Sequence, residues 1–297
     1  MKKLILSTLS ILFFAGILNA QIIETSNIQE IRKEINDDTL VLFNLAEVLT
    51  DTETSLGTQA WRKFIRRRVE AKLHDELTLF AFKNIPHKSP EASIPELIDE
   101  LQSQGIVVLA FTSRGRPEWY TSQFPDIDLL TEKVLLEIGF DFSKTKLNKE
   151  LALLPSLFED FYHSGIIYGT NIREKDELLL EILQKSDFRP SKIVFVDDKI
   201  DSLISMEAAL NNLNIPFVGY AYSKTKQNHA SFNPLIANIQ LDWLITYGQV
   251  LTDKEAIKIM NEKFFNIDLN QYFNEVIGKW DISKYNLREL PSPYRYP

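Results

Sequence analysis

The chain has 297 residues, a formal net charge of −8 and no cysteine, with 44% hydrophobic and 25% charged residues. These proportions are typical of a globular protein with a substantial core, and the length allows one α/β domain with an insertion. The acidic balance argues against a general nucleic-acid binder, because such proteins need basic surfaces to meet phosphate. The lack of cysteine excludes disulfides and thiol-based metal or redox chemistry.

The N-terminal segment has the pattern of a secretory signal peptide. Two lysines follow Met1, an apolar run extends from Leu4 to Leu18, and a small residue stands at Ala20. This pattern predicts cleavage after Ala20. The apolar run is short for a membrane span and lacks a stop-transfer flank. We therefore expect an exported protein, in the periplasm or secreted, that is not an integral membrane protein after cleavage.

The region that follows predicts a helix, a strand and then more helices. Apolar residues in 21–37 recur at near-helical spacing, and residues 40–43 form an apolar strand that ends at Asn44. Between residues 51 and 105 the apolar spacing is helical and no second parallel strand is visible. We expect a helical cap insertion in this region.

Further strands and helices alternate along the rest of the chain. Residues 106–111, 165–169, 191–197 and 216–221 predict strands, with helices over 175–184 and from Leu203 to Leu213. Alternation of this kind predicts a doubly wound, Rossmann-like parallel sheet. Residues 193–196 contain no polar side chain, which indicates a strand buried on both faces. Residues 235–265 predict helix, with a capping-box start at 252–255.

These elements predict five consecutive or interleaved parts. They are a signal peptide (1–20), a core (21–50 and 106–222), a helical cap insertion (51–105), a C-terminal helical extension packed on the core (223–290), and an extended or disordered tail (291–297).

Polar residues stand where several predicted strands end. Asn44 ends the first strand, Thr112 the second, and the pair Asp197 and Asp198, followed by Asp201, ends a later one. Doubly wound sheets bind ligands at the carboxyl ends of their strands, and carboxylates there suit Mg²⁺. The simpler alternative is that the aspartates cap the helix that follows.

The order of these strand ends resembles the haloacid dehalogenase-like (HAD) phosphohydrolase superfamily. Its Rossmann-like sheet carries four motifs in the order of Phe43-Asn44, Phe111-Thr112-Ser113, Lys175 and Val196-Asp197-Asp198. Within the superfamily the chain is similar to a family of exported bacterial proteins of unassigned function. The stretches that carry this narrower similarity are Ser55-Leu-Gly followed by Trp61, the insertion after the first strand, Phe111-Thr-Ser-Arg-Gly115, Phe195-Val-Asp-Asp-Lys199 and Gln249-Val-Leu-Thr-Asp-Lys-Glu-Ala256.

The first motif departs from the superfamily pattern. The resemblance implies an aspartate nucleophile and, two positions on, an aspartate that acts as general acid and base, but Asn44 and Ala46 stand there. An amide is a poor nucleophile and an alanine has no proton to give, and loss of acid–base help alone lowers rates by about 10²–10⁴. Glu47 is the one visible rescue. Neighbouring strand residues point to opposite faces, so its use requires a reshaped loop.

The other motif positions retain the residue types that the resemblance implies. They are a hydroxyl for a phosphoryl oxygen, a cation, and metal-holding acids, matched by Thr112 or Ser113, by Lys175, and by Asp197, Asp198 and Asp201. We expect weak Mg²⁺ binding, because an amide replaces one anionic ligand. Arg114 and Arg116 could bind an anion beside the site. The alternatives are a turn hydroxyl, a solvated lysine, helix caps and surface arginines.

Three functions follow from these residues. We expect a catalytically impaired pseudophosphatase that keeps the fold and an anion-binding site, with a phosphorylated small molecule or a protein as partner. The first alternative is an active Mg²⁺-dependent phosphomonoester hydrolase in which Asn44 positions water and Glu47 is the base. The second is an interaction protein acting through its cap or C-terminal helices. An exposed apolar patch over Trp61, Phe64 and Phe82 would support it, and the simpler alternative is that these three residues belong to the core.

Overall fold

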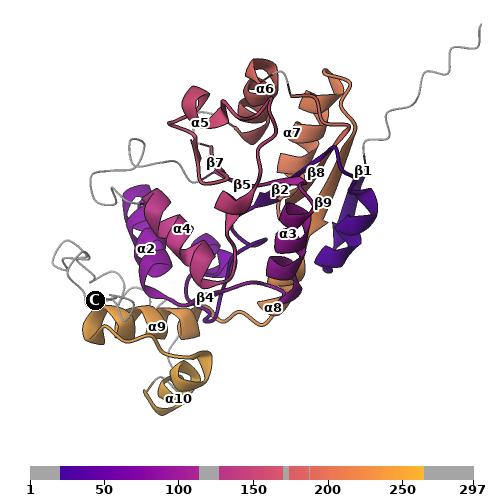
Figure 1. Ribbon diagram of the computed structural model, residues 1–297. Helices are drawn as coiled ribbons and strands as arrows, with labels where there is room; N and C mark the ends of the chain where they lie inside the picture. Colours follow the sequence, from indigo (N-terminus) through magenta and orange to yellow (C-terminus); the bar gives the residue numbers. More distant parts are fainter. Residues whose placement is uncertain (1–20, 114–126, 170–173, 187, 264–297) are drawn as a thin grey trace, which may run out of the picture.

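A seven-stranded, mostly parallel sheet forms the centre of the protein (Figure 1). The computed structural model describes residues 21–113, 127–169, 174–186 and 188–263. The strand order is β1-β9-β8-β2-β5-β7-β6, in which only β6 runs antiparallel to its neighbour within this described sheet. The strands are β1 (Gln21–Thr25), β2 (Thr39–Asn44), β5 (Val107–Thr112), β6 (Tyr162–His163), β7 (Ile166–Tyr168), β8 (Lys192–Asp197) and β9 (Phe217–Tyr222).

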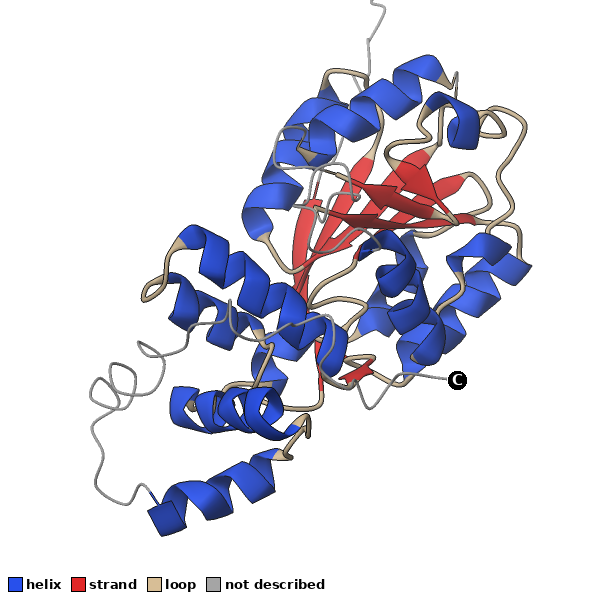
Figure 2. Cartoon of the chain, turned by 90° about the vertical axis from the view of Figure 1, so that its left-hand side faces the viewer, coloured by secondary structure: helices blue, strands red, loops and turns tan. Residues whose placement is uncertain are grey.

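Helices cover both faces of this sheet, as Figure 2 shows. Alternate residues of β2 enter opposite cores, with Val41 and Phe43 on one side and Leu40 and Leu42 on the other. This alternation confirms a Rossmann-like α/β architecture in which central strands are buried on both faces. The first face packs against η1 (Ile28–Glu34), α3 (Ser93–Ser103), α4 (Ile127–Glu137) and η2 (Phe142–Lys144), and the second against α5 (Leu154–Leu157), α6 (Lys175–Lys185) and α7 (Ile200–Asn211).

Four helices form a second body at the carboxyl side of the sheet. α1 (Gln59–Arg66) and α2 (Ala71–Asn84) share a hydrophobic core with α9 (Pro234–Tyr247), and α10 (Asp253–Lys263) packs on α9. A two-stranded antiparallel sheet pairs β3 (Asp51–Thr52), which precedes α1 in the chain, with β4 (His87–Lys88), which follows α2. Within the predicted C-terminal extension, α9 therefore packs on the helices that follow β2.

Burial favours the core alternative for Trp61, Phe64 and Phe82 over an exposed apolar patch. Trp61 is 0% exposed and Phe82 is 8% exposed, while Phe64 is partly buried against the same helices. These side chains are core residues because α9 and α4 cover them. An interaction surface built from these three residues is not present.

Two further expectations are corrected near the chain's beginning. Residues 21–25 form the edge strand β1, parallel to β9, and only the residues after them form a 3₁₀ helix. Ile22 and Ile23 pack on opposite faces of the sheet. In the sequence, their positions also fit the near-helical spacing of the apolar residues that follow. The α3 helix, expected in the cap insertion, packs on the sheet through Ile94 and Leu97, so the insertion ends before α3.

The C-terminal helical region contains two helices, the second of which begins at the predicted helix start. α9 ends at Gly248, whose φ of +66° lies in the left-handed region that favours glycine as a C-cap. α10 begins with the expected capping box, in which the Thr252 N–H and the Glu255 N–H each donate to the other residue's side chain.

Two distant sequence stretches meet where α10 begins. The Asp253 carboxylate accepts from the Ser55 N–H at 2.8 Å and from the Ser55 hydroxyl at 2.7 Å. The Gln240 amide donates to Asp253 at 2.8 Å and accepts from the Leu56 N–H at 2.9 Å. The loop before α1 is therefore held by the C-terminal helices.

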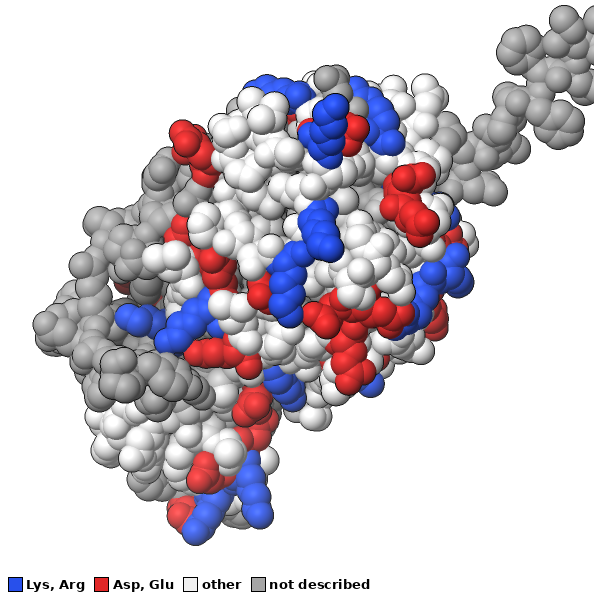
Figure 3. Space-filling model, viewed as in Figure 1, with Lys and Arg blue, Asp and Glu red and all other residues white. Residues whose placement is uncertain are grey.

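The surface carries charges of both signs. Figure 3 shows acidic and basic side chains interspersed over the face that it presents. Within the described ranges, no helix combines the length and the apolar character that crossing a membrane requires.

Candidate functional site

The polar strand ends converge at one edge of the sheet. β2 lies between β8 and β5, with Phe43 beside Val196 and Asn44 beside Phe111. The carboxyl ends of these three parallel strands therefore meet. Lys175, the first residue of α6, reaches the same point.

Asn44 is hydrogen-bonded through both atoms of its amide. Its Oδ1 accepts from Lys175 Nζ at 2.8 Å, and its Nδ2 donates to Asp198 Oδ1 and to the Ala46 carbonyl, each at 2.8 Å. A lysine ammonium can only donate and a carboxylate can only accept, so the partners fix which end of the amide is oxygen. The position implied for the nucleophile is thus a buried structural amide, 6% exposed.

Lys175 forms a buried ion pair. Its ammonium donates to Asp197 Oδ2 at 2.7 Å, and Asp197 is 0% exposed. Burial lowers the pKa of Lys175, and the charge of Asp197 opposes that shift. The ammonium also lies 5.1 Å from the ring centroid of Phe195. The alternative of a solvated lysine is wrong. We call Asn44, Lys175 and Asp197 the closed centre.

Asp197 also has part of the capping role considered for it. Its Oδ1 accepts from the Lys199 N–H at 3.1 Å, and Lys199 is the N-cap of α7. The carboxylate therefore orients the turn that connects β8 to α7 while it neutralises Lys175.

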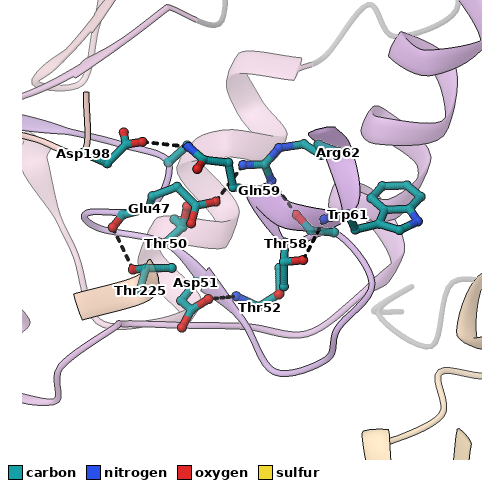
Figure 4. A network of polar contacts seen from close by, with 12 residues as sticks. Glu47, Thr50, Asp51, Thr52, Thr58, Gln59, Trp61, Arg62, Asp198 and Thr225 are labelled. Carbon is teal, nitrogen blue, oxygen red and sulfur yellow. Dashed lines mark hydrogen bonds and ion pairs between the residues drawn. The ribbon is translucent and has the colours of Figure 1, made fainter. Parts of the chain in front are cut away.

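Asp198 sits beside the closed centre with neutral partners. Its Oδ1 accepts from Asn44, and its Oδ2 accepts from Gln59 Nε2 at 2.8 Å. Burial, followed by the charges of Asp197 and Glu47, raises the pKa of Asp198 to about 6. Figure 4 shows Gln59 extending from α1 towards this carboxylate.

Glu47 belongs to a reshaped loop after β2. Its φ of +67° lies in the left-handed region that side chains rarely adopt. Its carboxylate pairs with Arg62 of α1 at 2.6 Å, and its carbonyl accepts from Thr225 of α8 (Lys224–Asn228) at 2.7 Å (Figure 4). The side chain therefore turns towards α1, and the structure gives it no hydrogen bond to Asp197 or to Thr112 among the described contacts.

A cavity of about 130 Å³ adjoins Glu47 and Asp198. It lies at the carboxyl ends of β1 and β9, between α1, α7 and α8. We call it the strand-end cavity. The residues that line it are Glu24, Glu47, Gln59, Asp198, Ile200, Ala221, Tyr222, Ser223, Thr225 and Lys226.

The remaining expected site residues differ in position. Thr112 is buried at the end of β5, with its carbonyl accepting from the Gly169 N–H, whereas Ser113 is exposed. Asp201 is exposed on the first turn of α7, apart from the buried Asp197. Arg114 and Arg116, expected to bind an anion, lie outside the described residues.

Sequence reasoning missed Gln59 and Arg62, the residues of α1 that contact Asp198 and Glu47. Gln59 lies between Ser55 and Trp61, in a stretch that carries the narrower resemblance, and Arg62 directly follows that stretch. Apolar spacing correctly predicted a helix there. Only the docking of that helix on the strand ends gives these two polar residues their partners.

The donor set does not fit Mg²⁺. The Lys175 ammonium, itself a cation, already donates to Asp197 Oδ2 and to Asn44 Oδ1, and Asp197 Oδ1 accepts from the Lys199 N–H. The Asn44 amide nitrogen lies between the Ala46 carbonyl and Asp198, the groups from which the resemblance implies metal ligands. Among the described residues, no group of three or more His, Asp or Glu side chains is arranged to hold a metal ion.

Comparison with known proteins identifies the family. Residues 24–257 match the family described as "Protein of unknown function (DUF2608)". A relative in Chlamydia trachomatis, named "Putative outer membrane protein", is 26% identical over 252 residues, covering 81% of this chain and 90% of that protein. An uncharacterized protein of Rickettsia prowazekii is 24% identical over 274 residues, covering 88% of this chain and 98% of that protein. No solved structure matches the chain significantly. The chain belongs to the DUF2608 family.

Proposed function

We propose that this DUF2608 family member is an exported protein with a HAD-like phosphohydrolase fold that does not turn over phosphomonoesters. The observation that carries the proposal is the amide of Asn44, held by Lys175 at one end and by Asp198 at the other. The HAD-like assignment is supported by the adjacency of β8, β2 and β5, whose ends bring the motif positions together in the manner that the sequence resemblance implies.

The chemistry of the closed centre supports loss of turnover. A covalent mechanism needs an anionic oxygen free to attack phosphorus. The Asn44 oxygen is neutral and accepts from an ammonium, while its nitrogen is a donor. Ala46 supplies no acid for a leaving group. Because no anionic oxygen stands at the nucleophile position, binding of a phosphate ester there would not lead to transfer.

Export is supported by two observations of different kinds. The first 20 residues have the pattern of a cleaved signal peptide. Relatives in Chlamydia trachomatis and Chlamydia muridarum each carry the name "Putative outer membrane protein". Cleavage after Ala20 would leave the edge strand β1, which begins at Gln21, intact.

The test is a hydrolysis assay of purified residues 21–297 with Mg²⁺ and generic phosphomonoesters. We expect no release of phosphate above that of an Asp197→Asn variant. Turnover by the wild type that disappears in Asp197→Asn and in Asp198→Asn would overturn the proposal. Export is tested separately by recovering the protein from the periplasm or medium and measuring its mass. The mass should be that of a chain that begins at Gln21.

One observation favours the active alternative. Glu47 and Asp198 line the same cavity, and the left-handed backbone at Glu47 is the reshaped loop that a displaced base would require. The ion pair with Arg62 opposes this role, because it engages the carboxylate. If Glu47 is a base, Glu47→Gln should abolish phosphate release and Arg62→Met should alter its pH profile. Equal activity in these variants and the wild type excludes that mechanism.

A further inference from the structure

The strand-end cavity has a charged wall that the closed centre does not use. It opens at the carboxyl ends of strands in a parallel α/β sheet, where such folds commonly hold ligands. Its lining includes the carboxylates of Glu24, Glu47 and Asp198, with Lys226 on α8 as the basic residue among the residues that line it. The lining therefore carries an excess of negative charge.

The carboxylates of this wall differ in how they are neutralised. Glu47 is paired with Arg62 at 2.6 Å. Asp198 accepts from two neutral amides, Asn44 and Gln59, and within the described part of the chain neither of its oxygens contacts a basic side chain. A largely buried carboxylate without a cation is costly, because its desolvation is not offset by an ion pair. The charges of Lys175 and Lys199 act on Asp198 without forming an ion pair with it, so its charge beside the cavity is only partly offset.

We propose that the strand-end cavity binds a small organic cation through a primary ammonium group, with Asp198 as its principal counter-ion. The inference does not depend on the loss of phosphohydrolase activity. An ammonium suits the site because it can donate to several separate oxygens, and the described residues offer no group of three acidic or histidine side chains for a metal.

Size and lining restrict the ligand further. A volume of about 130 Å³ corresponds to roughly four water molecules at about 30 Å³ each. Ile200 and Ala221 supply an apolar side for a short alkyl chain, and Glu24 supplies a second carboxylate at the exposed rim. A phosphate would meet the charges of Glu24, Glu47 and Asp198, so this cavity favours an amine over an anion.

The test is a titration of residues 21–297 with butylammonium chloride at constant ionic strength. Binding is monitored through the chemical shifts of the amides in NMR spectra. Butan-1-ol, which has the same alkyl chain without the charge, is the control ligand. We expect saturable shifts at the Gln59 side-chain amide and at the Ser223 and Lys226 amides with the amine only. Equal saturation by butan-1-ol, or the absence of saturation with the amine, would overturn the proposal.

Matched variants separate a specific counter-ion from general charge. Asp198→Asn should weaken butylammonium binding by about tenfold or more, and Glu24→Gln by roughly two- to threefold. Asp201→Asn makes the same change in net charge on the exposed face of α7 and should leave binding unchanged. If Asp198→Asn does not fold, the affinities of Glu24→Gln and Asp201→Asn for butylammonium are compared instead. Weakening in Glu24→Gln alone supports the proposal. Equal weakening by Asp201→Asn, or saturation of the same amides by phosphate or MgCl₂ at comparable concentration, contradicts the assignment.

Discussion

The two sides of Asp198 contrast a closed centre with an open cavity. On one side, Lys175 neutralises Asp197 and donates to Asn44, so that every charge has an oppositely charged or hydrogen-bonding partner. On the other side, Asp198 and Glu24 face a cavity of about 130 Å³. Under the proposed HAD-like fold, the asparagine at the nucleophile position is part of the internal structure. The adjoining wall kept its negative charge.

Removal of the buried cation should have the largest effect on this contrast. Lys175→Met leaves Asp197 buried and unpaired, which is expected to lower the free energy of unfolding by about 3–5 kcal/mol. Chemical denaturation measures the change. Lys185→Met, on the same helix with a side chain 52% exposed, should cost less than about 0.5 kcal/mol. Similar losses in the two variants would show that the closed centre is not a stabilising unit.

The C-terminal helices support the α1 wall of the cavity through Asp253. Asp253→Ala removes the acceptor for both Ser55 bonds and for Gln240. We expect a loss of about 2 kcal/mol and faster hydrogen exchange in residues 55–62. Glu262→Ala, on the same helix with a side chain 60% exposed, is the control. Unchanged exchange in Asp253→Ala would mean that α1 docks on the strand ends independently of α10.

Introducing an acid at position 44 should convert hydrogen bonding into repulsion. Asn44→Asp places an acceptor against Asp198 Oδ1 and the Ala46 carbonyl, and should cost about 1–3 kcal/mol. Millimolar MgCl₂ should recover part of this loss in the variant and leave the wild-type melting temperature unchanged. Asn211→Asp, at an exposed position of α7, controls for net charge. Stabilisation of the wild type by Mg²⁺ to the same extent would contradict the donor-set argument.

The last expected effect concerns protonation of Asp198. Its pKa in the folded protein, about 6, lies above the ordinary value of 3.8, because burial and the nearby charges of Asp197 and Glu47 disfavour the ionised form. The folded state therefore binds this proton more tightly than the unfolded state. Its contribution to stability is fully present below the ordinary value and is lost as the pH rises towards 6.

Carboxyl NMR should show an Asp198 titration near pH 6 that is absent in Asp198→Asn. In that variant the free energy of unfolding should fall less between the ordinary pKa of 3.8 and the folded-state pKa of about 6 than in the wild type. Asp201→Asn should leave both unchanged. An Asp198 midpoint near 4 would show that its charge is already neutralised in solution.

The fold was largely readable from local pattern. Unbroken apolar runs such as 193–196 predicted strands buried on both faces, and the capping box at Thr252 predicted the start of α10. The errors occurred where a residue's partner lies far along the chain. Ile22 and Ile23 were assigned to a helix because nothing local shows that β9 would pair with them. The sequence favours a core position for Trp61 but does not identify its cover, because α9 lies about 180 residues later.

The sequence by itself determined which chemical groups stand at the strand ends: an amide at Asn44, no acid at Ala46, a lysine at Lys175 and the aspartates after β8. Those identities are sufficient to question turnover, because side-chain chemistry does not depend on tertiary context. Only the tertiary structure decided that Lys175 is buried against Asp197, that Glu47 turns to Arg62, and that Asp198 keeps a charge facing a cavity. The reason is that burial and pairing arise from segments that meet only after the sheet and the α1–α9 helices have packed.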